Sequence, residues 1–268
     1  MKSLIALLIV TFVLALSSCV YAEDNAYTVK GGIYYSQQWG LYIANVIEKD
    51  GKLLNVVIDR LANGKSSKEL HDSYGIKKVS TLGKEWWEQV AYYESWVVGH
   101  GLDSVSGATV EGALETDEKG HAVNPDLLSG ATINVAELSY AVKNAIDGKT
   151  SDGGYTMKTG KAFSQVWGLY IANVIFKDGK IVKVLLDRIS KTGEDSKEKY
   201  DNYGIKPHSS IKKDWWEQVA YYEDWILEHG IDAVKYDSKG HAENVDLISG
   251  ATIGIDDMTL AVQDALKH

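Results

Sequence analysis

The chain has 268 residues, a formal net charge of −9 and a sequence pI near 5.3. An acidic balance without a Lys/Arg-rich block argues against nucleic-acid binding, which generally needs a basic face. Hydrophobic residues at 45% and charged residues at 24% are ordinary contents, so we expect a globular protein with one large or two small domains.

The beginning of the chain predicts an export signal. Residues 4–16 are almost wholly apolar, a run too short to span a membrane but of the length of a signal-peptide core. Two alternative processing sites follow. Residues 16–19 (LSSC) resemble a lipobox, in which Cys19 is lipidated, and residues 20–22 (VYA) resemble an ordinary signal-peptidase cleavage site. We expect a signal peptide over residues 1–22 and favour lipidation, because Cys19 ends the apolar run. It is the only cysteine, so no disulfide is expected.

Two long segments of the chain repeat each other. The sequence WGLYIANVI occurs at residues 39–47 and again at 167–175, and WWEQVAYYE occurs at 86–94 and again at 215–223. The period is far longer than that of a solenoid unit, so the repetition predicts two tandem homologous domains.

We place the first domain at residues 27–148 and the second at 155–268, with a polar, glycine-rich linker at residues 147–154. In each domain two β-rich runs flank an Asp-Gly pair, which predicts a hairpin. Apolar spacing predicts helices over residues 85–98 and 214–228. Each domain is therefore expected to be α+β, a small antiparallel sheet packed with helices.

The pattern Asp-x-x-Ser-Gly-Ala-Thr occurs at residues 103–109, 126–132 and 246–252. The last two copies occupy matching places in the repeats and precede an amphipathic helical pattern. Small residues let a ligand approach the backbone, and a helix N-terminus favours an anion such as a phosphate. A helix N-cap explains one Ser or Thr. It does not explain the same four residues, each with the same aspartate, in three places.

A DxxSGAT segment followed by such a helix resembles the flavinylation motif of the FMN-binding domain family. That family includes the threonine-linked FMN subunits of sodium-pumping NADH:quinone reductases and of Rnf complexes. In it, a flavin transferase uses FAD to attach FMN through a phosphoester to the final threonine. The tandem layout with a lipoprotein-like signal is also similar to the secreted flavin lipoproteins of Gram-positive extracellular electron transfer. The resemblance covers both repeats in layout, and its closely matching residues are the motifs and their helices.

The resemblance implies that Thr132 and Thr252 carry FMN, two per chain. It also implies that the transferase recognises the other motif residues, which are Asp126, Ser129, Gly130 and Ala131 in the first site and Asp246, Ser249, Gly250 and Ala251 in the second. Thr109 ends the remaining copy of the motif. It is the weaker candidate for flavin, because a polar turn follows it and the second repeat has no counterpart.

All eight tryptophans fall in four matched pairs. Most have the spacing of core residues, whereas Trp39 and Trp167 each end a polar stretch and are candidates to line a pocket for a flat ring. The histidines lack a second ligand at metal-binding spacing, so no metal site is expected. The sequence contains no P-loop, no GxGxxG pattern and no nucleophile with a matched base, which favours a carrier over a stand-alone enzyme.

These features predict an exported, membrane-anchored electron carrier with covalent FMN in each domain. Its expected partners are the flavin transferase, a membrane electron donor, an extracellular electron acceptor and, through a lipid on Cys19, the membrane. Covalent attachment would prevent loss of the cofactor by dilution outside the cell. The alternative is a non-redox extracellular lipoprotein that binds carbohydrate or another flat ligand on exposed aromatic rings. Such a protein has no need of Thr132 and Thr252.

Overall fold

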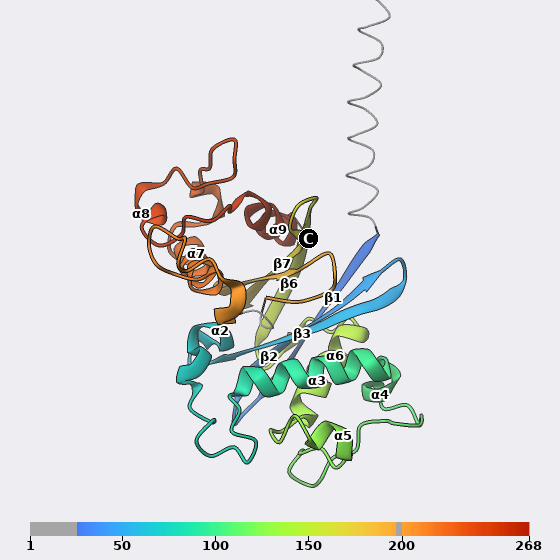
Figure 1. Cartoon of the computed structure of the whole chain (residues 1–268). Coiled ribbons are helices and arrows are strands. Elements are labelled where there is room, and N and C mark those ends of the chain that lie inside the picture. The colour runs from blue at the N-terminus through green and yellow to red at the C-terminus, as the bar shows by residue number, and fades with distance from the viewer. Residues whose placement is uncertain (1–25, 197–199, 268) are drawn as a thin grey trace, which may run out of the picture.

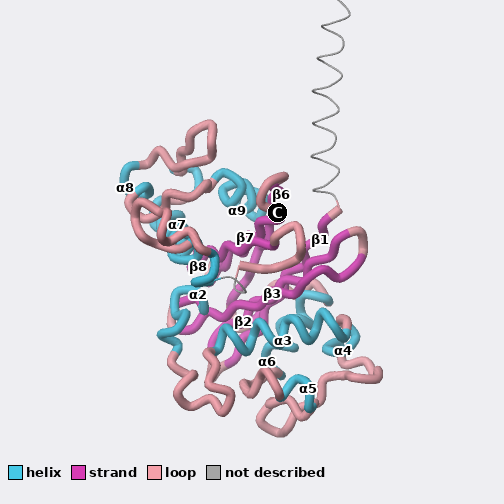
Figure 2. Tube along the Cα trace, viewed as in Figure 1, coloured by secondary structure: helices cyan, strands magenta, loops and turns pink. Residues whose placement is uncertain are grey.

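The structure is a computed structural model that describes residues 26–196 and 200–267. The expected signal peptide and Cys19 lie outside these residues. In the described part the predicted α+β class is confirmed, because two four-stranded antiparallel sheets pack with helices (Figures 1 and 2). Each repeat contributes one sheet.

The first sheet has the strand order β1-β2-β3-β4. Its strands are β1 (Tyr27–Ser36), β2 (Gly40–Lys49), β3 (Lys52–Ala62) and β4 (Lys65–Ser66). The helices that follow are α2 (Ser67–Leu70), the 3-10 helix η1 (His71–Tyr74), α3 (Trp86–His100), α4 (Asp103–Ser106), α5 (Pro125–Leu128) and α6 (Ala136–Ile146). The helix predicted at residues 85–98 is confirmed as α3, which begins with a capping box between Glu85 and Glu88.

The second sheet has the order β5-β6-β7-β8. Its strands are β5 (Ser151–Asp152), β6 (Tyr155–Ser164), β7 (Gly168–Lys177) and β8 (Lys180–Ile189). Its helices are η2 (Tyr200–Tyr203), α7 (Trp215–His229), η3 (Ile231–Ala233), α8 (Val245–Ile248) and α9 (Asp256–Lys267). The helix predicted at residues 214–228 is confirmed as α7. Both predicted hairpins are present, and both residues of each Asp-Gly turn have the positive φ that such a turn requires.

The central strand of each sheet is buried on both faces. In β2, Tyr42, Ala44 and Val46 pack under the helices of the first repeat. Leu41 and Ile43, on the other face, pack against the second sheet. For this reason the repeated strand is apolar at nearly every position, with Asn45 and Asn173 as the buried exceptions, rather than alternating with polar residues. Figure 1 shows the result, with α3 and α6 on one side of the paired sheets and α7 and α9 on the other.

Both repeats contribute to one apolar layer between the sheets, which we call the inter-sheet layer. Its buried side chains are Ile33, Leu41, Ile43, Leu61, Met157, Ile175 and Leu185 in one cluster, and Tyr27, Ile47, Val57, Leu169, Ile171 and Ile189 in another. The strands β1 and β6 approach closely here. A Cβ atom on Gly31 would lie 2.1 Å from Thr159 Oγ1, so a larger residue at this position would force the Thr159 side chain to move.

The segment predicted as a linker, residues 147–154, folds against the first sheet. The Asp152 carboxylate in β5 accepts a hydrogen bond of 2.9 Å from the backbone N–H of Tyr35. The Ile33 N–H donates to the carbonyl of Lys149 at 3.2 Å. The passage between the repeats is therefore held by hydrogen bonds to β1.

Weakening the inter-sheet layer from one repeat should destabilise the other repeat as well. Ile43→Ala removes buried methyl groups and is expected to lower the free energy of unfolding by about 2–5 kcal/mol. We also expect faster amide hydrogen exchange in β6, β7 and β8, measured by mass spectrometry. Val79→Ala, at a side chain that is 82% exposed, is the control and should change neither quantity. Faster exchange confined to the first repeat would contradict a shared core.

Candidate functional site

In the two copies of the motif that match between the repeats, the aspartate joins a short helix to the long helix of the same repeat. Asp126 Oδ2 accepts a hydrogen bond of 2.6 Å from Trp96 Nε1 and lies 3.3 Å from His100 Nε2. The rings of Trp96 and His100 stack, with centroids 4.2 Å apart. The second repeat has the same contacts, at 2.8 Å and 3.6 Å, in Asp246, Trp225 and His229. The indole N–H lowers the pKa of each aspartate carboxyl, because it bonds to the ionised form.

A tyrosine from the long helix fixes the serine and the glycine. Ser129 Oγ donates to the carbonyl of Asp126 at 2.6 Å and lies 2.9 Å from the Tyr92 hydroxyl. A Cβ atom on Gly130 would lie 2.1 Å from the Tyr92 ring, so only glycine leaves room for that ring. Ala131 is wholly buried. The second repeat has the same arrangement in Ser249, Gly250, Ala251 and Tyr221.

In the two copies of the motif that match between the repeats, the threonine is held by a buried glutamine, which the sequence did not single out. The backbone N–H and the hydroxyl of Thr132 both donate to Gln89 Oε1, at 2.8 Å and 3.2 Å. Thr252 donates to Gln218 Oε1 at the same two distances. We call each pair a threonine seat. The only indication in the sequence is that each glutamine belongs to the repeated segment WWEQVAYYE.

The prediction that the threonine stands at a helix N-terminus is wrong. The helix α6 begins at Ala136, and its N-cap residue is Val135 rather than Thr132. Its first N–H groups are already bonded, because Val135 and Ala136 donate to the carbonyl of Gly120 at 2.8 Å and 3.1 Å. Neither an N-cap role nor a free helix N-terminus therefore accounts for the threonine.

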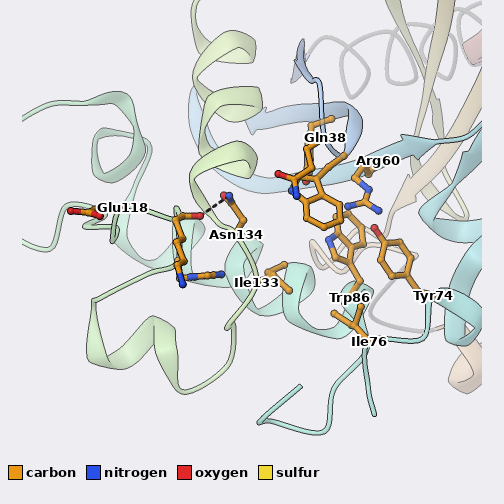
Figure 3. Close-up of a pocket in the computed structure, with 12 residues that line it drawn as sticks. Gln38, Arg60, Tyr74, Ile76, Trp86, Glu118, Ile133 and Asn134 are labelled. Atoms are coloured by element: carbon orange, nitrogen blue, oxygen red, sulfur yellow. Dashed lines mark hydrogen bonds between the residues drawn. The ribbon is translucent and has the colours of Figure 1, made fainter. Parts of the chain in front are cut away.

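The first repeat contains an aromatic cavity of about 610 Å³, whose lining residues are drawn in Figure 3. Ile133 and Asn134, the two residues after Thr132, line it, as does Trp86 from the same helix as Gln89. Trp39, which the sequence indicated as a candidate pocket residue, also lines it. Thr132 and Gln89 are not among the lining residues, and the motif threonine is next in sequence to Ile133 of the cavity wall.

A buried arginine is the central charged group of this cavity. The Arg60 guanidinium lies 4.7 to 5.8 Å from four ring centroids, those of Trp39, Tyr42, Tyr74 and Trp86. Figure 3 shows it beside Tyr74 and Trp86. Its Nε atom has no hydrogen-bond partner among the described residues. A cation at the wall of an aromatic cavity suits an electron-rich ligand.

The second repeat contains the same cluster. Arg188 lies 5.7, 5.0 and 5.6 Å from the ring centroids of Trp167, Tyr203 and Trp215. Its Nε also lacks a partner within the described part of the chain. Trp167 is 57% exposed, which leaves a ring face accessible to a ligand.

The third copy of the motif is built differently. Its aspartate begins α4, Gly107 follows with a φ of 88°, and Thr109 is exposed in the next loop. Neither the tryptophan contact nor the glutamine contact of the other two copies is found here among the described residues. Thr109 therefore has no threonine seat.

The paired histidines have structural partners. His100 and His229 contact the motif aspartates, and His121 lies in a turn with its Nδ1 3.2 Å from Asp117 Oδ2. Residues 26–196 and 200–267 contain no group of three side chains placed to bind a metal ion. Within the same residues, no helix has both the length and the apolar character needed to cross a bilayer.

No protein-family model matches the chain, and no curated protein matches it. A solution NMR structure of a protein from Clostridium thermocellum is similar to it, at 29% sequence identity. The match covers 41% of this chain and 88% of the other, with a TM-score of 0.31.

Replacing Trp96 by Phe should raise the pKa of Asp126, because it removes the N–H that lowers it. Because the pKa of Asp126 is lowered in the folded protein, the contact stabilises the fold at pH values above the ordinary aspartate pKa. This stabilisation is lost as the pH falls through the pKa of the carboxyl in the folded state. NMR titration of the Asp126 carboxyl carbon measures the change. Asp246, whose tryptophan partner is intact, is the internal control. An unchanged Asp126 titration would exclude the indole as the cause.

Proposed function

We propose that this chain is an exported electron carrier in which FMN is joined by phosphoester bonds to Thr132 and Thr252. One observation carries the proposal. Both threonines occupy the same seat, a hydroxyl bonded to a buried glutamine, in repeats that each hold an arginine among aromatic rings. The threonine, the glutamine and the buried cation are retained together in both repeats, although the loops around them differ.

The cavity residues suit the flat ring of a flavin. A volume of 610 Å³ lies within the range of about 300–1,000 Å³ that is usual for small-molecule sites. Trp39 is 44% exposed and offers a face for stacking. Arg60 lines the same cavity and places a positive charge beside the ring. FMN bound there would supply one- and two-electron chemistry. The Arg60 charge would stabilise the negative charge that the ring gains on reduction.

A second positive charge suits the phosphate end. Lys84 Nζ lies 5.4 Å from the centroid of the Tyr92 ring, which packs on Gly130. In the second repeat, Lys213 Nζ lies 5.2 Å from the Tyr221 ring. A lysine near each motif would balance the charge of a phosphoester on the neighbouring threonine.

The remaining parts of the proposal come from the sequence. A lipid on Cys19 would hold the chain at the outer face of the membrane, and a flavin transferase would load it. A membrane donor would reduce the protein, and an extracellular acceptor would oxidise it. The exposed Trp39 and Trp167 also support the alternative, a non-redox protein that binds carbohydrate or another flat ligand. That alternative gives the threonine seats no role.

Thr132→Val and Thr252→Val should each remove one FMN, and the double variant should remove both. Valine keeps the shape of threonine but lacks the hydroxyl that an ester requires. The intact mass of protein co-expressed with a flavin transferase measures the number of FMN groups. Thr109→Val is the matched control and should leave that number unchanged. Unmodified wild-type protein in the presence of an active transferase would overturn the carrier proposal and favour the ligand-binding alternative.

Arg60→Gln should lower the midpoint potential of the first flavin, because the variant loses the charge that stabilises the reduced ring. We expect a decrease of at least about 30 mV, which corresponds to roughly 1.4 kcal/mol for a two-electron couple. Spectroelectrochemistry of the Thr252→Val chain, which carries only the first flavin, measures it with and without the Arg60 change. An unchanged potential would mean that Arg60 does not contact the ring.

A further inference from the structure

The side-chain amide of Gln89 is fixed at both ends. Its Nε2 donates to the Lys84 carbonyl at 3.1 Å and to Ser80 Oγ at 3.2 Å, while its Oε1 accepts both bonds from Thr132. A backbone carbonyl only accepts, so the amide nitrogen must face Lys84 and the oxygen must face the threonine. The side chain is wholly buried, and every polar group of the amide has a partner. Its orientation therefore follows from the bonding.

The second repeat reproduces this network. Gln218 Nε2 donates to the Lys213 carbonyl at 3.0 Å and to Ser209 Oγ at 3.3 Å, and its Oε1 accepts from Thr252 at 2.8 Å and 3.2 Å. The residues around the two serines differ, VSTLGK in one repeat and HSSIKK in the other. The hydrogen-bond network is therefore the same in both repeats, although the residues around it differ.

An amide oxygen cannot donate, so the threonine hydroxyl must give its hydrogen to the glutamine. This fixes the rotation of the hydroxyl and leaves the lone pairs of Oγ1 directed away from the glutamine. We propose that Gln89 and Gln218 are positioning residues that orient Thr132 and Thr252 for attack on the phosphorus of a flavin dinucleotide. This inference rests on the proposed function.

The proposed step transfers FMN from FAD to the threonine and releases AMP. Thr132 Oγ1 forms a bond to the FMN phosphorus of FAD, the pyrophosphate P–O bond breaks, and AMP leaves. As the P–O bond forms, the hydroxyl hydrogen leaves Gln89 and passes to a base of the transferase, because a neutral amide oxygen is too weakly basic to keep the proton. After the reaction the ester oxygen has no hydrogen, so the hydroxyl bond to Gln89 exists only in the reactant. The bond from the Thr132 backbone N–H to Gln89 remains and continues to hold the loop. Fixed orientation of a nucleophile is a large source of rate.

Each chain contains its own control for testing this. Gln89→Leu should lower the ratio of FMN on Thr132 to FMN on Thr252 on the order of 10²-fold, which is the effect of misplacing a reacting group by about 1 Å. Gln218→Leu should change the ratio in the opposite direction. Peptide mass spectrometry after partial conversion by the transferase measures the ratio. Wild-type ratios in both leucine variants overturn the proposal. Absence of FMN from both threonines of the wild type is a different result, which overturns the proposed function itself.

A second measurement separates orientation of the hydroxyl from the shape of the loop. In the Thr252→Val chain, Gln89→Leu should lower the kcat of the transferase for this protein with little change in KM. A raised KM with unchanged kcat would mean that Gln89 only shapes the loop that the transferase recognises, and would overturn the proposal. In the flavin-free protein, we also expect faster exchange of the Thr132 amide hydrogen.

A conservative variant covers the case in which leucine prevents folding. In Gln89→Glu, a protonated carboxyl can donate to Lys84 and accept from Thr132, so it replaces the amide. The ionised carboxylate cannot donate, and it brings a negative charge near the pyrophosphate. Modification of Thr132 should approach the wild-type rate at low pH and fall as the pH rises through the pKa of the new carboxyl. Thr252 in the same chain should show no such added dependence, and identical pH profiles at the two sites would contradict the proposal.

Discussion

The burial of β2 and β7 on both faces is the constraint on which the rest of the structure depends. A sheet without a solvent face needs an apolar layer on each side. The helices of its own repeat cover one face, and the sheet of the other repeat covers the second. The helices must therefore lie on the outside, together with the motif loops that pack on α3 and α7. Figure 1 shows α5 and α8, which lead into those loops, far apart on opposite sides of the paired sheets.

Neighbouring positions at the start of each sheet show how closely the layers approach. A Cβ atom on Gly32 would lie 2.0 Å from the backbone of Ala145, so α6 requires glycine there, and α9 requires Gly160 in the same way. Gly31 instead faces Thr159 of the other sheet, whose hydroxyl donates to Asn173 at 2.8 Å. The helix contact is thus the same in both repeats. The sheet contact is complementary, because one repeat supplies a side chain and the other leaves the space for it.

Sequence patterns were sufficient for the features that local chemistry determines. The Asp-Gly turns, the helices α3 and α7 and the duplication all follow from spacing and turn residues. The pairing of the sheets does not, because an apolar strand such as residues 41–47 does not reveal what covers its second face. Gln89 also has no recognisable pattern, since only the fold brings it to Thr132, 43 residues away. The sequence predicts that the motif leads directly into a helix, but α6 begins only at Ala136, and nothing in the sequence indicates that Val135 and Ala136 donate to the distant Gly120 carbonyl.

The two repeats differ at several matching positions, whereas the two threonine seats are the same. Asn55 and Lys183 occupy matching positions in β3 and β8, but Asn55 donates to the Gly193 carbonyl at 2.7 Å, whereas Lys183 lies 2.8 Å from both Glu69 and Asp224. At these two positions the side chains differ because each one contacts a different part of the opposite repeat. The threonine seats take no part in this contact, so fitting the halves together does not explain why they are alike. The seats come from the duplicated segment, and their retention in both repeats is what the proposed attachment of FMN to each threonine would require.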